Sequence, residues 1–327
     1  MKKLAIIFIF SLFVSNALAP KTFATETVIN LAEQNLFPEG ITSDQSGNLY
    51  VSSLKKGKIV KIDALTKQAT DFAASNQDGL TSVVGLYADN KNHLLYACSS
   101  DTGVAEVANK TKPALKVFDF KTAKLKASYD LPQGGANGSF CNDITIDNKN
   151  NVYVTDSFNP RILVLERKGK ELKEFVSSEL FKAEGFGLNG IDFQDGYLLV
   201  NKYNDGKLFR INVRKKKIEE VALSRPISHA DGLKFIAKDV LLVVEGSFST
   251  NNSTAVGGTG GVSKIKLTVA KDKVSGDIQK LVEGLDVPAT LTVTKNGIFV
   301  TESQYDHLYQ YKNIPPYNFR IFGINLQ

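Results

Sequence analysis

The chain has 327 residues, and its 40 lysines and arginines exceed its 34 aspartates and glutamates, which gives a formal net charge of +6. The densest basic run, Arg214–Lys217, is closely followed by Glu219 and Glu220, and no aromatic stacking platform accompanies it. We therefore expect a solvated hairpin there and no nucleic-acid partner. The two cysteines are too few for a disulfide-scaffold protein or for the usual four-ligand thiolate metal site.

The first residues predict a cleaved signal peptide. Two lysines are followed by an apolar run, Leu4–Val14, that is too short to span a bilayer, and then by small residues that include Ala17 and Ala19. An uncleaved membrane anchor is the less favoured alternative. We assign residues 1–24 to the signal peptide, with cleavage near 17–24, and residues 25–327 to a single domain. Export places the mature chain in the periplasm or outside the cell, with no stable membrane span.

The mature chain contains an internal repeat. Six segments share two small or polar residues, an alternating apolar strand, a hairpin turn and a second, strongly apolar strand. Their spacing of roughly 40 to 60 residues is typical of a stacked supersecondary unit. The six openings are Pro38–Ile41, Val83–Leu86, Cys141–Ile144, Leu188–Ile191, Ala230–Leu233 and Pro288–Leu291.

The segments after each opening complete an antiparallel unit. Turn residues such as Gly47, Asn150 and Asn296 join the first two strands, and a third strand such as Lys207–Ile211 alternates apolar and polar residues. No long amphipathic helical stretch occurs, which disfavours a parallel sheet with helical crossovers. We predict an all-β fold, a six-bladed β-propeller of four-stranded antiparallel blades around a central channel. A β-sandwich would not explain six recurring openings.

Two further features concern the ends and the fifth unit. The apolar segments Thr27–Leu31 and Phe319–Ile324 flank the repeats, and we expect both termini to complete the last blade jointly. The fifth unit carries an insertion, Gly246–Gly261, rich in Gly, Ser, Thr and Asn. It predicts a flexible loop, because the strand-to-helix context of a phosphate-binding loop is missing.

The openings also predict a cation site. The first strand of each blade lines the channel of a propeller, so the second residues of the six openings form a ring around the axis. Two carboxylates and two amides in this ring are costly to bury without a counter-charge, and hard oxygen ligands suit one divalent cation, Ca²⁺ rather than Mg²⁺. Taken singly, each residue is better explained as a turn residue or cap than as a ligand, and their coincidence at one register in four repeats favours the cation. The ring is Glu39, Val84, Asn142, Asn189, Asp231 and Ala289.

The openings Pro38–Ile41, Cys141–Ile144, Asn189–Ile191 and Asp231–Leu233 resemble those of the superfamily of senescence marker protein-30, gluconolactonases, paraoxonases and squid-type phosphotriesterases. The resemblance spans almost the whole mature chain, although its motifs are short and specific only jointly. It implies a catalytic calcium that acts on lactones, esters or organophosphates. By position it makes Glu39, Asn142, Asn189 and Asp231 the metal ligands, and Asp231 the nucleophile or base.

Other residues are predicted around this site. Paraoxonases use a histidine pair near the metal, but His93, His229 and His307 form no evident dyad here. Strand ends on the same predicted face offer further substrate or supporting contacts, with solvated strand ends as an equal alternative. The strand ends are Asp156, Asn201, Glu245 and Glu302. Asp143 and His229 are further candidates, although a histidine on a surface loop is the favoured interpretation of His229.

The two cysteines are predicted to form a disulfide. Cys98 follows the second strand of the second blade, and Cys141 opens the first strand of the third. We expect both positions on one face of neighbouring blades, and an exported chain is in an oxidising compartment. Two buried free thiols are the alternative that their spacing alone does not exclude.

Three functions remain after these steps. The leading one is a calcium-dependent hydrolase of small lactones or esters, with Asp231 as its catalytic residue. A second is a non-catalytic propeller that binds a ligand or protein partner with a structural calcium. A third, a strictosidine-synthase-like propeller, does not need the ring of oxygen donors. The identity of the substrate lies in loops whose conformations the sequence does not determine.

Overall fold

The computed structural model describes residues 26–324, apart from residues 102, 247–259 and 272. The predicted signal peptide therefore lies outside the described residues, as does most of the predicted loop Gly246–Gly261. Within the described part of the chain, no helix is long and apolar enough to cross a membrane.

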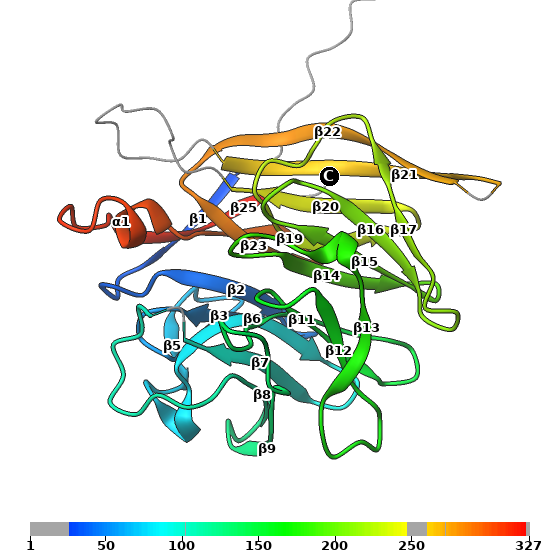
Figure 1. Cartoon of the computed structure of the whole chain (residues 1–327). Helices are drawn as coiled ribbons and strands as arrows, with labels where there is room; N and C mark the ends of the chain where they lie inside the picture. The colour runs from blue at the N-terminus through cyan, green and yellow to red at the C-terminus, as the bar shows by residue number, and fades with distance from the viewer. Residues whose placement is uncertain (1–25, 102, 247–259, 272, 325–327) are drawn as a thin grey trace, which may run out of the picture.

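The described residues form six antiparallel sheets, each a blade, in a ring (Figure 1). The predicted six-bladed β-propeller is confirmed. The first three blades, listed from the axis outward, are β2 (Pro38–Ser43), β3 (Leu49–Ser53), β4 (Ile59–Ile62) and β5 (Ala69–Ala73); β6 (Ser82–Asp89), β7 (Leu94–Ser100), β8 (Ala114–Asp119) and β9 (Leu125–Asp130); and β10 (Cys141–Ile146), β11 (Val152–Asp156), β12 (Arg161–Leu165) and β13 (Lys173–Ser177).

The other three blades follow the same plan with two additions. Blade 5 has a fifth strand, β18 (Ala222–Leu223), which pairs in parallel with β22, and a short helix α1 (Tyr305–Tyr309) interrupts blade 6. The blades are β14 (Leu188–Gln194), β15 (Tyr197–Lys202), β16 (Leu208–Asn212) and β17 (Ile218–Glu220); β19 (Ala230–Ala237), β20 (Val240–Glu245), β21 (Gly260–Ala270) and β22 (Lys273–Leu285); and β23 (Pro288–Thr294), β24 (Gly297–Glu302), β25 (Phe319–Ile324) and β1 (Glu26–Leu31).

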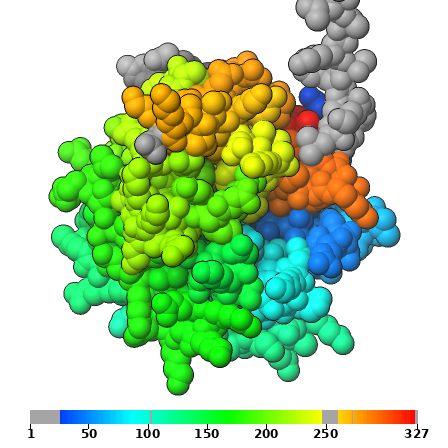
Figure 2. Space-filling view, turned by 90° about the vertical axis from the view of Figure 1, so that its right-hand side faces the viewer, coloured from blue at the N-terminus to red at the C-terminus, as the bar shows by residue number. Residues whose placement is uncertain are grey.

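Both chain ends close the ring, as predicted. The strand β1 pairs with β25 along its length, from Glu26 opposite Ile324 to Leu31 opposite Phe319, and β25 pairs with β24. In Figure 2 the orange surface of the last blade lies beside the blue surface of the first. Each innermost strand packs beside two others, so that β2, β6, β10, β14, β19 and β23 form a closed ring around the axis.

Burial explains the strongly apolar second strands. Every residue of β3, β11 and β24 is buried, because neighbouring blades cover both faces of each sheet. Such strands read as continuous apolar runs, whereas outer strands such as β9 alternate between half-buried and exposed residues. The predicted loop Gly246–Gly261 is too long at its C-terminal end. Gly260 and Gly261 begin β21, where Gly261 pairs with both Glu245 and Glu283.

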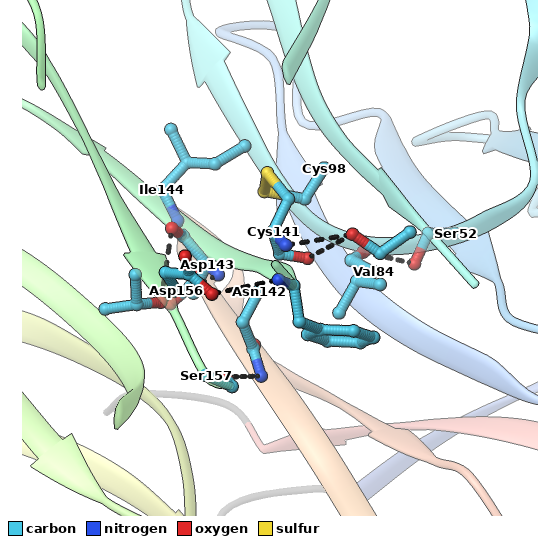
Figure 3. Close-up of a disulfide and its surroundings, with 12 residues drawn as sticks. Ser52, Val84, Cys98, Cys141, Asn142, Asp143, Ile144, Asp156 and Ser157 are labelled. Carbon is cyan, nitrogen blue, oxygen red and sulfur yellow. Dashed lines mark hydrogen bonds between the residues drawn. A yellow bond between two sulfur atoms is a disulfide. The ribbon is translucent and has the colours of Figure 1, made fainter. Parts of the chain in front are cut away.

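The predicted disulfide between Cys98 and Cys141 is confirmed. The Cα atoms lie 5.1 Å apart, and both side chains are buried. The bond joins β7 of blade 2 to β10 of blade 3, directly beside Asn142 (Figure 3). It therefore links two blades covalently at the axis.

We expect the double variant Cys98→Ala/Cys141→Ala to be less stable than the parent by about 2–4 kcal/mol, because the bond closes a long loop in the unfolded chain. Urea unfolding of the oxidised parent and the variant measures the difference. Mass analysis without reductant is the control for the bond itself. Two free thiols in the native parent would contradict the assignment.

Candidate functional site

All six innermost strands carry a β-bulge at the same place. On each inner strand, two consecutive residues lie opposite a single residue of the second strand, and pairing is regular on either side of them. A bulge of this kind bends the strand and redirects a side chain. The first bulge residues are the predicted ring, Glu39, Val84, Asn142, Asn189, Asp231 and Ala289.

Four of the second bulge residues are glycine because the inner strands approach one another closely there. A Cβ atom on Gly40 would lie 2.4 Å from the carbonyl oxygen of Val84, and one on Gly190 would lie 2.4 Å from that of Asp231. Any larger residue at these positions would push neighbouring blades apart at the axis. The full set is Gly40, Gly85, Asp143, Gly190, Gly232 and Thr290.

One polar side chain opposite the bulge serves two backbone groups in four of the blades. In blade 6, Thr301 Oγ1 accepts a hydrogen bond from the amide of Thr290 at 3.1 Å and donates to the carbonyl of Glu39 in blade 1 at 2.9 Å. The bulge amide, which has lost its strand partner, is thereby satisfied. The same hydroxyl fixes the backbone of a predicted ligand in the next blade.

The other three side chains act in the same way. Asn201, one of the predicted supporting residues, accepts from the amide of Gly190 and donates to the carbonyl of Asp231. The remaining pair is Ser52, between Gly40 and Val84, and Thr155, between Asp143 and Asn189. We call Ser52, Thr155, Asn201 and Thr301 the interblade clips.

The two other blades differ at the clip position. Cys98 stands there in blade 2, and its disulfide to Cys141 replaces the hydrogen bond with a covalent link. Val244 stands there in blade 5 and offers no polar group. The backbones that carry Asn142, Asn189, Asp231 and Glu39 are thus each tied to the preceding blade.

We expect Thr301→Val to lower the free energy of unfolding by about 1–3 kcal/mol, because it leaves the half-buried Thr290 amide without its partner and the Glu39 carbonyl without this donor. Thr301→Ser keeps the hydroxyl and is the matched control. Urea unfolding compares the three proteins. Equal stability of the Val and Ser variants would show that the clip contributes nothing.

The four predicted ligands line one cavity of about 280 Å³ on the axis. They are nearly buried, with 4–7% of their surface exposed. Apolar and aromatic side chains form most of the rest of the lining. These are Leu54, Val84, Phe140, Phe186, Tyr203, Tyr305 and Tyr309, with Gln310 beside them.

The cavity floor concentrates negative charge. Glu39 Oε2 and Asp231 Oδ1 are buried and accept no hydrogen bond from any described residue. Burial raises the pKa of Glu39 well above its ordinary value, and the charges of Asp231 and Asp143 raise it further. Burial and Asp143 also raise the pKa of Asp231, against the lowering effect of a hydrogen bond from Asn189. Two buried carboxylates with unpartnered oxygens are stable as anions only beside a cation.

The donor set fits a hard divalent cation. Asn142 donates from Nδ2 to Ser157 at 2.8 Å, an arrangement that leaves its amide oxygen available (Figure 3). Within the described residues, no cluster of three or more His, Cys, Asp and Glu side chains could hold a metal, and this site has two carboxylates and two amides instead. Carboxylate and amide oxygens in irregular geometry are what Ca²⁺ accepts.

Without a cation, stability should fall as the pH rises. The folded pKa values of Glu39 and Asp231 lie above their unfolded values, and burial raises that of Asp143 to about 6. Above about pH 4 the folded state therefore binds more protons than the unfolded state. The stability that each of the three carboxyl groups contributes is lost as the pH rises through its folded pKa. Thermal unfolding in chelator from pH 4 to 8 measures the decline, which should be shallower in Glu39→Gln. Stability that rises over this range would contradict the shifts.

Three of the predicted supporting carboxylates do not line the cavity. Asp156, Glu245 and Glu302 are buried, so they are not solvated strand ends either. Each carboxylate accepts a hydrogen bond from a backbone amide in the loop that leads into its inner strand. Each also forms an ion pair with an arginine, and these contacts together hold the loop before the bulge. The groups are Asp156 with Phe140 and Arg161, Glu245 with Ser228 and Arg225, and Glu302 with Asp286 and Arg320.

The histidines stand apart from the cavity floor. His229 is half-buried, and its ring contacts the edge of Tyr203, which lines the cavity, at a centroid distance of 5.4 Å. His307 lies in α1 with Nδ1 against the carbonyl of Ile314, and His93 lies in a turn. Asp143 is held by the amides of Ile144 and Ile191, one level below the predicted ligands.

The aromatic walls were not predicted. Phe140 and Phe186 precede the openings of blades 3 and 4, and Tyr203 follows the second strand of blade 4. The signal in the sequence was their position, immediately before or after the strands whose ends meet at the channel mouth. Tyr305 and Tyr309 belong to α1, which has no counterpart in the repeat, so no signal pointed to them.

Comparisons with known proteins support the fold. A sequence model described as major royal jelly protein matches residues 100–185, which is less than half of the chain. No curated protein matches the sequence. Among solved structures, the chain is similar to a putative oxidoreductase (glucose dehydrogenase) from Thermus thermophilus, with a TM-score of 0.61 and 11% identity over 92% of this chain and 99% of that chain.

Two further structures have the same level of similarity. The major allergen Mala s 1 of Malassezia sympodialis has a TM-score of 0.60 and 15% identity, over 91% of this chain and 96% of that chain. Virginiamycin B lyase from Staphylococcus aureus has a TM-score of 0.56 and 15% identity, over 93% and 99%. Such identities support the shared propeller fold and carry no activity over to this chain.

Proposed function

We propose that this protein is an exported, calcium-dependent hydrolase of small lactones or esters. The observation that carries the proposal is the pair of buried, unpartnered carboxylate oxygens of Glu39 and Asp231 on the floor of an apolar-walled cavity, with Asn142 and Asn189 beside them. These carboxylates need a cation beside them, and the apolar walls suit a small uncharged substrate. The resemblance of the openings to calcium-dependent lactonases supports the same conclusion.

The chain's own residues have distinct tasks in this proposal. When bound, the divalent cation supplies Lewis-acid polarisation of the substrate carbonyl. Phe140, Phe186 and Tyr203 hold the apolar part of the substrate and exclude bulk water. Asp231 attacks the carbonyl carbon itself or takes the proton from an attacking water.

The overall reaction is hydrolysis. The oxygen of water becomes bonded to the carbonyl carbon, and the bond from that carbon to the ring or ester oxygen breaks. The leaving oxygen takes a proton, so a lactone gives a hydroxy acid. The clip from Asn201 to the carbonyl of Asp231 holds the backbone of the attacking residue in place during this exchange.

Turnover of a panel of lactones, aryl esters and phosphotriesters, with calcium and with chelator, tests the proposal. We expect calcium-dependent hydrolysis of at least one lactone or ester, lowered at least about 100-fold in kcat by Asp231→Asn, because the attacking carboxylate is lost. Asp147→Asn, which changes a buried aspartate in the turn after β10, is the matched control outside the cavity.

Three outcomes separate the alternatives. Calcium that stabilises the protein without any hydrolysis, with no effect of Asp231→Asn, indicates a non-catalytic binding propeller with a structural ion. No stabilisation by any divalent ion removes the cation site from the proposal. Hydrolysis that persists in chelator removes the metal from the mechanism.

A further inference from the structure

A second polar ring crosses the channel below the proposed cation site. It lies three residues after the ligand positions on each inner strand. A lysine and an aspartate belong to this ring, so the channel holds a fixed positive charge as well as carboxylates. Its members are Thr42, Tyr87, Thr145, Asp192, Lys234 and Thr292.

Lys234 spans the axis. Its Nζ lies 3.3 Å from Asp192 Oδ1 in the adjacent blade 4 and 4.8 Å from the ring centroid of Tyr87 in blade 2. Blades 2 and 5 are opposite each other in the closed ring of inner strands. The ammonium group therefore lies across the channel between β19 and β6.

Asp192 is fixed by two further groups. Its Oδ1 accepts from Thr145 Oγ1 at 3.1 Å, and its Oδ2 accepts from the amide of Phe235 at 2.8 Å. Burial disfavours a charged Lys234, but its interactions with Asp192, Tyr87 and Asp143 outweigh burial and raise its pKa. Lys234 therefore stays protonated in the channel beside Asp192.

Asp143 connects the two levels electrostatically. It lies between the rings, at the second bulge residue of blade 3, where two backbone amides hold it at 2.8 and 3.1 Å. Its charge acts on Lys234 and also on Glu39 and Asp231. Lys234 and the two carboxylates that would hold the cation therefore share Asp143 as an electrostatic neighbour.

We propose that Lys234 is a positioning residue that weakens divalent-cation binding at the Glu39–Asp231 ring, by partly neutralising the channel carboxylates from below. A like charge a short distance along a poorly hydrated channel opposes a divalent ion. The proposal rests on the cation site proposed above, and it makes opposite predictions for the two members of the Lys234–Asp192 pair.

Titration calorimetry of the mature chain with Ca²⁺ alone, in metal-free buffer, tests the proposal. We expect Lys234→Met to bind Ca²⁺ about tenfold more tightly, and Asp192→Asn, which leaves the ammonium unpaired, to bind about tenfold more weakly. The double variant removes both charges and should bind like the parent. Lys116→Met is the control, since Lys116 is a buried lysine on β8 away from the axis.

The outcomes are distinguishable. Opposite shifts in Kd support the proposal, because a purely structural ion pair would lower the thermal midpoint of both variants in chelator without moving the two Kd values apart. Binding within twofold of the parent in both variants overturns it. If Lys234→Met does not fold, an unchanged Kd in Asp192→Asn overturns it alone. If the parent binds no Ca²⁺, the cation site itself fails, and the inference with it.

Discussion

The extra residue in each innermost strand is the constraint on which the rest of the site depends. A bulge leaves one backbone amide without a strand partner, and a buried amide needs another acceptor. Ser52, Thr155, Asn201 and Thr301 supply it and then donate to the next blade. The hydrogen bonds that shape the cavity floor are therefore the ones that hold neighbouring blades together.

The six seams between blades differ in the kind of link at this position. Four have a hydrogen-bonded clip, and the seam between blades 2 and 3 has the disulfide of Cys98 and Cys141 at the same position. The seam between blades 5 and 6 has Val244 there, so apolar packing takes the place of the clip. The proposed ligands lie in blades whose inner strands are tied to the preceding blade.

Charge in the channel is divided between two levels. The upper ring holds two carboxylates that each have one oxygen without a partner among the described residues, and the lower ring pairs Asp192 with Lys234. Burial makes the upper level costly without a counter-ion, whereas the lower level is satisfied by the chain itself. Asp143 lies between them, and its charge acts on groups at both levels. An ion bound at the proposed site would therefore also stabilise the fold.

The sequence by itself determined the blades, the closure by both termini, the disulfide and the residues of the axial ring. Strand periodicity and turn chemistry are local properties, and six copies of one opening reveal their common register. Only the tertiary structure decided the rest. Tyr305 lines the cavity from a helix outside the repeat. Asp156 is buried and accepts a hydrogen bond from the loop before its inner strand, and Lys234 contacts Tyr87 across the axis. Such contacts join segments far apart in the chain, and they exist only once the ring is closed.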